Sequence, residues 1–229
     1  LAYEMGASRS KNALAAGIKN ILAIALIIPA FYLFGWWIYN AFPNGFVPIE
    51  AAAALPWAAS MGPDVQDMGT GIFWAAFALF GATTGSILSG AVIERIRVSA
   101  FLILTIFLGG VVWIMAGAWG WHPDGWLLTE FGYHDVGASG VVHAVAGFFT
   151  LGVLMNLGAR KGKFIDGVPQ IISPHSLPMT LIGLMMIIFG FFGFLGGCII
   201  FNGGETGWTT IYGTPTNLSA FAFNTLMGF

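Results

Sequence analysis

The chain alternates between long stretches without a charged side chain and short segments that carry its Asp, Glu, Lys and Arg residues. Five uncharged stretches run between Lys19 and Glu50, Asp67 and Glu94, Arg97 and Asp124, Asp135 and Arg160, and Asp166 and Glu205. A helix of about 20 apolar residues crosses the hydrocarbon layer of a membrane, which is about 30 Å thick, and each stretch is long enough for one. The pattern therefore predicts membrane-spanning helices.

We expect five complete spanning helices and one partial helix, near 14–41, 70–93, 98–121, 136–159, 176–201 and, incompletely, 217–229. Residues 1–13 are interpreted as the end of an earlier helix and a basic turn. The proline-containing loop 43–68 has room for a short interfacial helix at 51–61. The chain opens on Leu1 without a start methionine, so we expect that its N-terminus is missing. We predict one transmembrane domain over 1–229, part of an all-α, polytopic helical membrane protein.

Composition supports this class, because 57% of the residues are hydrophobic and only 8% are charged. A soluble domain carries roughly 25% charged residues, which cover its water-facing surface. The single cysteine, Cys198, lies inside a predicted span and therefore does not indicate a redox compartment.

The basic residues gather at the ends of alternate predicted helices and indicate an orientation. Arg9, Lys11 and Lys19 precede the first helix, Arg95 and Arg97 follow the second, and Arg160, Lys161 and Lys163 follow the fourth. Basic loops stay in the cytoplasm, so we expect a multi-pass protein of the cell (inner or plasma) membrane with these loops inside. The opposite loops are acidic; they either concentrate a small cation or merely translocate easily.

The segment Asp135-Val-Gly-Ala-Ser-Gly-Val-Val-His143 carries the most informative polar residues. Asp135 lies at the expected start of the fourth helix, where a carboxylate caps free backbone N–H groups, with or without a ligand. His143 follows eight residues later, about 12 Å deeper if the segment is helical. An ionisable residue inside a span predicts a functional site, although a neutral histidine bonded to a neighbouring helix is an equal alternative.

Aromatic residues are the second feature. Trp119 and Trp121 end the third helix, Phe73, Phe77 and Phe80 form a stripe on the second, and Phe189, Phe191, Phe192 and Phe194 crowd the fifth. Single membrane aromatics usually face lipid or the interface. Together they can enclose a small cation, because a desolvated ring attracts one by ~2 kcal/mol.

Asp135–His143, continued by Ala-Val-Ala-Gly147, resembles the signature of the ammonium transporter family (Amt/Mep/Rh). Four further motifs occur in the family's order: Arg9-Ser-Lys-Asn12, Gly90-Ala-Val-Ile-Glu-Arg-Ile-Arg97, Pro174-His-Ser-Leu-Pro178 and Phe191-Phe-Gly-Phe-Leu-Gly-Gly197. The resemblance covers nearly the whole chain, from the end of the first to the seventh of the family's eleven helices. It implies an incomplete ammonium-transporter-like bundle.

The resemblance also implies roles for individual residues. Trp121 and Phe80 match the outer site that binds ammonium, Asp135 supports that site, and Cys198 stands where the family has a serine ligand. Phe194 matches the gate below, and His143 the first of two pore histidines. Family members form homotrimers with one pore in each subunit.

The chain departs from the family at several of these positions. Phe191-Phe-Gly-Phe-Leu195 replaces Trp-Phe-Gly-Phe-Asn, Phe77 replaces a glutamine, and the thiol of Cys198 is a poorer acceptor than a hydroxyl. The second pore histidine lies beyond Phe229 in the family pattern. These departures bear on whether the chain conducts.

Three functions stay open at this point. The first is an ammonium transporter or channel in the lipid bilayer, which binds ammonium outside, removes a proton and passes ammonia through a histidine-lined pore. The second is an ammonium sensor or receptor that couples to a regulatory or signalling partner on the cytoplasmic face. The third is a non-conducting subunit of a larger membrane assembly.

An enzyme is disfavoured, because His122, His134, His143 and His175 lack the close spacing of a zinc site. The chain has no glycine-rich phosphate loop and no nucleophile elbow. We expect no metal, no cofactor and no nucleic-acid partner.

Overall fold

The computed structural model describes residues 1–49, 68–135, 137–199, 201–202 and 208–209. Its α-helices are α1 (Ala2–Ala7), α2 (Ser10–Ala30), α3 (Trp36–Ala41), α4 (Met68–Ala91), α5 (Val98–Phe107), α6 (Trp113–Gly120), α7 (Trp126–Phe131), α8 (Val145–Leu157) and α9 (Leu177–Ile199). Three π-helical segments join them: η1 (Phe31–Gly35), η4 (Leu108–Val112) and η5 (Ser139–Ala144). Two short hairpins pair β1 (Phe164–Ile165) with β2 (Val168–Pro169) and β3 (Phe201–Asn202) with β4 (Trp208–Thr209).

Five helices within the described residues are long and apolar enough to cross a membrane. They are Ser10–Ala41, Phe73–Ala91, Val98–Gly120, Ser139–Leu157 and Leu177–Phe194. The fold class predicted from the sequence, an all-α polytopic helical membrane protein, is therefore confirmed. The predicted interfacial helix 51–61 and the partial helix 217–229 lie outside the described residues.

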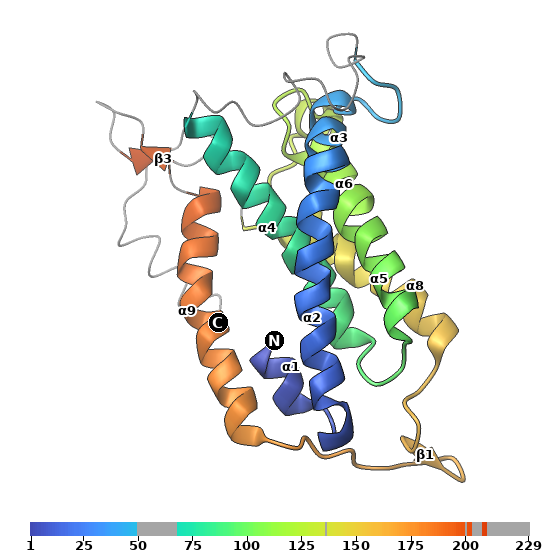
Figure 1. Cartoon of the computed structure of the whole chain (residues 1–229). Coiled ribbons are helices and arrows are strands. Elements are labelled where there is room, and N and C mark those ends of the chain that lie inside the picture. The colour runs from blue at the N-terminus through green and yellow to red at the C-terminus, as the bar shows by residue number, and fades with distance from the viewer. Residues whose placement is uncertain (50–67, 136, 200, 203–207, 210–229) are drawn as a thin grey trace.

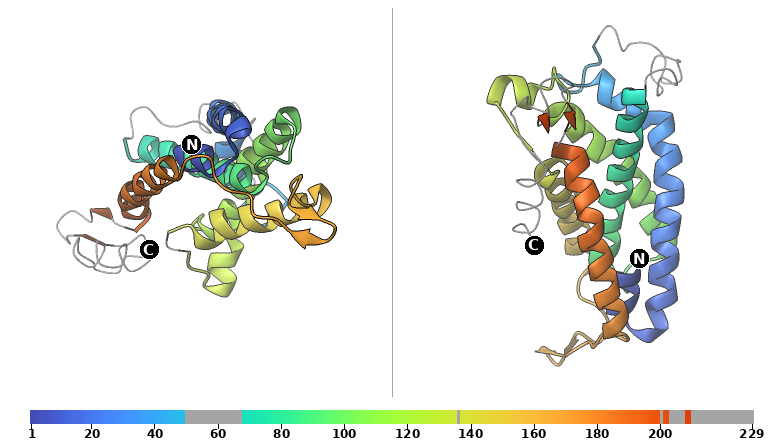
Figure 2. Two further views of the ribbon diagram at one scale, coloured as in Figure 1. Left: turned by 90° about the horizontal axis from the view of Figure 1, so that it is seen from below. Right: turned by 90° about the vertical axis from the view of Figure 1, so that its left-hand side faces the viewer.

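The long helices run between two ends of the molecule (Figure 1). One end, here called the basic end, holds the turn before α2, the turn between α4 and α5, and the segment with β1 and β2. The other, here called the acidic end, holds the segments that follow α3 and α6. α1 lies between α2 and α9 at the basic end, and both views of Figure 2 show α9 on the flank of the bundle.

Two large clusters of buried apolar side chains, and a small one around Ala41, lie in the described interior. The large cluster towards the acidic end is rich in aromatic residues and contains Phe31, Trp36, Phe77, Phe80 and Trp113. The one towards the basic end is mainly aliphatic and contains Ala23, Ile27, Leu88, Val92, Phe101 and Leu108. The interior is therefore divided by chemistry along the direction of the helices.

α4 and η4 cross closely because glycines face each other at the crossing. A Cβ atom on Gly81 would lie 3.1 Å from the carbonyl oxygen of Gly109, and one on Gly109 would lie 3.1 Å from that of Gly81. Such small residues let helix backbones approach and gain dispersion contacts where lipid supplies no hydrophobic drive.

An ion pair joins three segments at the basic end. The Arg9 Nε atom donates to Glu94 Oε2 at 2.7 Å, and the Arg9 backbone N–H donates to Glu94 Oε1 at 2.7 Å. The guanidinium of Arg9 also donates to the carbonyl oxygen of Lys161 at 3.2 Å, and the Arg95 guanidinium donates to that of Gly158 at 3.1 Å. These contacts tie the turn before α2 to the segments that follow α4 and α8.

Lys19 does not lie before the first span, and that prediction is wrong. The residue belongs to α2 and is only 4% exposed, with its ammonium nitrogen 5.2 Å from the centre of the Phe101 ring. A hydrogen-bonded group of polar side chains, here called the Glu4 cluster (Glu4, Asn20, Ser86 and Ser89), is buried nearby. The interior near the basic end is therefore less apolar than the uncharged stretches predict.

Four features had no counterpart among the predicted elements: the π-helical segments, the short helix α7, the β1–β2 hairpin and the β3–β4 pair. A π segment adds one residue to a helical turn and often occurs at functional sites. The π-helical segments η1, η4 and η5 lie inside spans that the sequence pattern shows as uninterrupted helices.

Candidate functional site

Asp135 lies in the segment between α7 and η5 and is only 5% exposed. Its Oδ2 atom accepts hydrogen bonds from the backbone N–H groups of Gly140 at 3.0 Å and Val141 at 2.7 Å. A helix start leaves these groups without partners inside the helix, and a carboxylate there also interacts favourably with the helix dipole. The capping role expected from the sequence is therefore confirmed.

The helical segment after Asp135 begins later than predicted. Gly137 and Ala138 precede it with left-handed backbone φ angles of 96° and 67°, and η5 starts at Ser139. Only the four steps from Ser139 to His143 are helical, so the rise of about 12 Å expected for eight α-helical steps does not apply. A positive φ at an alanine is uncommon and indicates a conformation imposed by its surroundings.

His143 lies in η5 and is half-buried. Its Nδ1 atom is 2.8 Å from the carbonyl oxygen of Ala138. In the neutral tautomer that this contact favours, Nδ1–H donates to the carbonyl and Nε2 is left as an acceptor. The partner is the backbone of its own segment, so the alternative of a histidine bonded to a neighbouring helix does not hold within the described residues.

Four residues predicted as site residues form one series of ring contacts between four elements. The Trp121 and Phe80 rings have centroids 5.2 Å apart, those of Phe80 and Phe194 4.8 Å, and those of Phe194 and His143 6.2 Å. Here Trp121, Phe80 and Phe194 are called the aromatic series. It leads from the end of α6 across α4 and α9 to the imidazole in η5.

Asp135 is joined to the aromatic series by a backbone contact. The indole Nε1–H of Trp121 donates to the Asp135 carbonyl oxygen at 3.1 Å. The carboxylate of the same residue caps η5, as described above. One residue therefore fixes both the orientation of the Trp121 ring and the start of the segment that carries His143.

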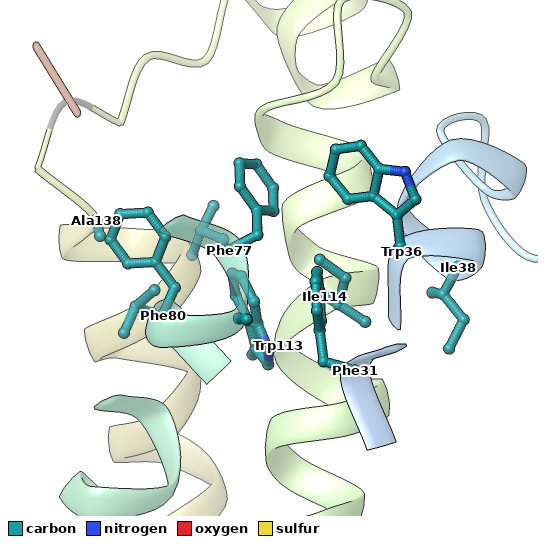
Figure 3. Packing of buried hydrophobic residues seen from close by; sticks show 11 residues of the cluster. Phe31, Trp36, Ile38, Phe77, Phe80, Trp113, Ile114 and Ala138 are labelled. Atoms are coloured by element: carbon teal, nitrogen blue, oxygen red, sulfur yellow. The ribbon is translucent and has the colours of Figure 1, made fainter. Parts of the chain in front are cut away.

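Further aromatic residues surround the series, and the sequence did not single out all of them. Phe77 lies 5.6 Å from Trp121, and Trp113 lies 5.9 Å from Phe77 and 6.3 Å from Trp121, between ring centroids. Tyr39 contacts Phe77 at 4.7 Å. Figure 3 shows Phe77 and Phe80 of α4 in one layer with Trp113 and Ile114 of α6. Spacing alone does not single out Trp113, which precedes Trp121 by eight residues, because aromatic residues are common in membrane spans.

Other predicted residues lie apart from this group. Trp119 packs against Phe46 at 5.2 Å and Trp126 at 6.0 Å instead. Phe73 is 41% exposed and Phe189 is 81% exposed, so neither belongs to the buried cluster. Cys198 belongs to α9, but its side chain lies outside the described part of the structure.

An apolar groove of about 500 Å³ runs between α4 and α8. It is lined by Ile87, Ala91, Ala144, Gly147, Phe148, Thr150, Leu151 and Leu154. Gly147, Thr150 and Leu154 follow His143 by four, seven and eleven residues, which places them on the same helix face, since a turn has about 3.6 residues. The groove therefore begins one residue after His143, at Ala144, and follows α8 towards the basic end.

The histidine next to Trp121 has a different environment. His122 lies 5.2 Å from the Tyr39 ring, and its Nδ1 atom accepts a hydrogen bond from the Asp124 backbone N–H at 3.1 Å. Burial lowers the pKa of His122, and the Asp124 carboxylate opposes the shift. The described residues contain no group of three or more His, Cys, Asp or Glu side chains that could hold a metal ion.

Comparison with known proteins gives one decisive result. The profile described as the Ammonium Transporter Family matches residues 1–228. The chain belongs to the Ammonium Transporter Family. The family predicted from the sequence motifs is thus confirmed, and the site lies in an ammonium-transporter fold.

Individual family members agree with this assignment. Ammonium transporter Amt2 of Archaeoglobus fulgidus is 31% identical over 96% of the chain and 47% of its own length. Ammonium transporter 1 member 4 of Arabidopsis thaliana is 29% identical over 97% of the chain and 45% of its own length. A solved structure titled Sensor Amt Protein matches with a TM-score of 0.71 and 28% identity, over 86% of the chain and 49% of that structure. The chain spans about half the length of these relatives.

Proposed function

We propose that the chain is part of an ammonium transporter or channel that binds ammonium at Trp121, Phe80 and Asp135 and passes ammonia by Phe194 and His143. The observation that carries this proposal is the unbroken contact series from Trp121 to the imidazole, followed by the groove on the same face of α8. Family membership supports ammonium as the substrate.

Binding at the acidic end depends on aromatic faces. Ring faces of Trp121 and Phe80 attract a desolvated cation, and the Asp135 carboxylate adds a negative charge close to them. The Trp121 ring is held by its bond to the Asp135 carbonyl, so the site is ordered before the cation arrives. Cys198 is proposed as a weaker ligand of the same site, by its family position.

The proposed path beyond the aromatic series is apolar, which suits neutral ammonia once ammonium has lost a proton. Moving an intact ammonium ion along an apolar groove would cost its hydration, whereas the cost for neutral ammonia is far smaller. His143 has an acceptor nitrogen available at the point where the aromatic series meets the groove. Potassium has a similar size but no proton to give, so this step selects ammonium.

We further propose the membrane, the orientation and the oligomeric state of the complete protein. The basic end faces the cytoplasm, in a cell (inner or plasma) membrane, since basic loops are retained on that side. The family pattern favours a homotrimer with one pore in each subunit. The chain, residues 1–229, would then contribute one transmembrane domain to each pore.

A second candidate function is an ammonium sensor. The solved structure that covers 86% of the chain is titled Sensor Amt Protein, and this similarity favours a receptor that reports ammonium to a signalling partner at the basic end. A sensor would keep the binding residues but would show no steady flux. A non-conducting subunit would show neither flux nor a signalling response.

The test uses the complete protein in liposomes, with uptake of radiolabelled methylammonium. We expect saturable uptake that falls strongly in His143→Ala and not in His175→Ala, since His175 is exposed at the basic end. Binding of methylammonium without uptake would support the sensor instead. Unchanged uptake in a folded His143→Ala protein would contradict the proposed site.

A further inference from the structure

Tyr133 lies between the two elements that carry the proposed binding residues, and the proposed function does not use it. It follows α7, whose C-cap, Gly132, has a left-handed φ of 62°. The Tyr133 backbone N–H donates to the carbonyl oxygen of Leu127 at 3.0 Å, and its side chain packs against the large cluster towards the acidic end. The tyrosine is therefore anchored on α7 and half-buried beside the aromatic residues.

The Tyr133 ring contacts the end of α6 at a glycine. A Cβ atom on Gly120 would lie 3.0 Å from Tyr133 Cε1 and 3.2 Å from Cδ1, so the ring fills the space that a side chain would need there. A methyl carbon of Val141 shares this space, also at 3.2 Å. Gly120 directly precedes Trp121, the first ring of the aromatic series. The position of the α6 terminus therefore depends on the Tyr133 ring.

The same ring contacts the start of η5 at a second glycine. A Cβ atom on Gly140 would overlap the Tyr133 hydroxyl oxygen and would lie 3.1 Å from Cζ. It would also lie 3.4 Å from Asp135 Oδ2, the atom that accepts the Gly140 N–H. Glycine allows a neighbouring group to approach the backbone this closely. Tyr133 therefore lies against backbone on both sides, before Trp121 and at the residue that Asp135 caps.

Contact with backbone on two sides distinguishes a spacer from a residue that only fills volume. A neighbouring side chain can rotate to take up a small shift, whereas closely packed backbone transmits the shift to the residues that follow it. Tyrosine suits a spacer, because its side chain is large and rigid and has only two torsions. The ring of Tyr133 therefore fixes the separation of the α6 terminus from η5.

We propose that Tyr133 is a positioning residue of the ammonium site and sets the separation between Trp121 and the start of η5 that Asp135 caps. It acts through these two residues and not on the cation itself. The separation lets the indole bond to the Asp135 carbonyl while the carboxylate bonds to Gly140. A site that is ordered before its ligand arrives loses less binding energy to ordering. The inference rests on the proposed function.

The first test measures the apparent affinity for external methylammonium and the maximal rate of its uptake, with the complete protein in liposomes. Tyr133→Leu should lower the affinity about tenfold and the maximal rate less than about twofold, because the cost of ordering falls on binding. Tyr133→Phe should keep most of the affinity, since the ring remains. A general folding defect would instead lower the amount of active protein, and so the maximal rate, without changing the affinity.

A second comparison isolates the contact with Gly140. The methyl group of Gly140→Ala would overlap the Tyr133 hydroxyl, which Tyr133→Phe removes. We expect Gly140→Ala to lower the affinity about tenfold in the original protein but less than about threefold in Tyr133→Phe, because residues in contact give non-additive effects. The control is Gly152→Ala, since Gly152 is exposed on α8 and a Cβ atom there would meet open space. It should leave the affinity unchanged in both backgrounds.

The outcomes separate this inference from the function on which it rests. Equal losses of affinity for Gly140→Ala in both backgrounds overturn the role of Tyr133, and so does an unchanged affinity in Tyr133→Leu. A loss of maximal rate without a loss of affinity also overturns it, because it indicates a role in folding alone. In each of these cases the original protein still takes up methylammonium, and the proposed function stands. Absence of saturable uptake and binding in the original protein contradicts the proposed function and the inference together.

Discussion

His143 and Glu4 are both ionisable residues inside the helix bundle, but the structure holds them in different ways. The His143 imidazole bonds only to the backbone of its own segment, within the described residues, and its other contacts are with rings such as Phe194. The Glu4 carboxyl group accepts bonds from side chains of α2 and α4 and so links three helices. The first arrangement ties the histidine to a single segment, whereas the second holds three helices together.

The chemical surroundings of His143 and Glu4 also differ. His143 contacts the Phe194 ring and directly precedes Ala144, which lines the apolar groove, so its neighbours are mainly apolar. Glu4 lies among hydroxyl and amide groups that stabilise either protonation state. A substitution at His143 should therefore change transport more than stability, and a substitution in the Glu4 cluster should also change stability.

The largest effect is expected on methylammonium uptake in His143→Ala, which tests the role proposed for His143. In His143→Ala we expect the rate of methylammonium uptake to fall on the order of a hundredfold, because the group that accepts the proton is lost. The melting temperature in detergent should change little, since no side chain of another helix loses a hydrogen-bond partner. A variant that melts far below the original protein would show that the histidine is structural.

Trp121→Leu should weaken binding rather than the later steps. A ring–cation contact of ~2 kcal/mol corresponds to about a thirtyfold change in affinity. The apparent affinity for external methylammonium should therefore fall by that factor, with a smaller change in the maximal rate. Trp119→Leu is the matched control, because Trp119 contacts Phe46 and Trp126 instead of the aromatic series.

The Glu4 half of the comparison is tested by Asn20→Ala. The change removes a donor to Glu4 Oε2 and leaves the Ser86 hydroxyl without its acceptor. We expect a loss of ~2 kcal/mol in the free energy of unfolding, since buried polar groups lose their partners. Asn156→Ala provides the control, because Asn156 is exposed and bonds only within α8. Equal stability of the two variants would remove the structural role of the cluster.

Two substitutions distinguish the capping role of Asp135 from the effect of its negative charge. Asp135→Ala should cost ~1 kcal/mol of stability, because Gly140 and Val141 lose their acceptor, while Asp135→Asn should cost less, since asparagine caps well. Only the charge is lost in Asp135→Asn, so a weaker affinity for methylammonium in that variant would be electrostatic. Asp124→Asn is the control, with a side chain that is 74% exposed. An Asn variant with full affinity would limit Asp135 to the capping role.

The smallest effect concerns pH at the basic end. Burial raises the pKa of Glu94, but hydrogen bonds from Arg9 and Asn12 and the charge of Arg9 outweigh it and hold the pKa below its ordinary value. The ionised carboxyl group therefore contributes stability that is complete above its ordinary pKa and is lost as the pH falls through the lowered one. Melting temperatures measured during acidification should fall further for the original protein than for Glu94→Gln. Parallel curves would contradict this contribution.

The sequence predicted the helices well because charge is excluded from spans by its solvation cost, which leaves a clear pattern. It also predicted the cap at Asp135, which depends on neighbouring residues. Lys19 was placed wrongly because its compensation comes from Glu4 and Phe101, residues far away in the sequence. The left-handed turn at Ala138 and the late start of η5 depend on contacts with Asp135 and the tertiary fold, and no local pattern indicates them.

The site residues show the same limit. The aromatic series could be predicted only by resemblance to the family, because the spacing of Trp121, Phe80 and Phe194 along the chain does not show that their rings meet. Trp113 and Tyr39 were missed because aromatic residues are common in membrane spans and carry little information one by one. The groove beside α8 depends on the packing of α4, which a sequence does not give.

The most direct test of the account is an experimental structure of the complete protein in a lipid disc. The account predicts a continuous apolar passage that starts below Phe194, passes the Nε2 atom of His143 and enters the groove between α4 and α8. Side chains of another helix filling that groove, or acyl chains packed against the imidazole, would contradict it.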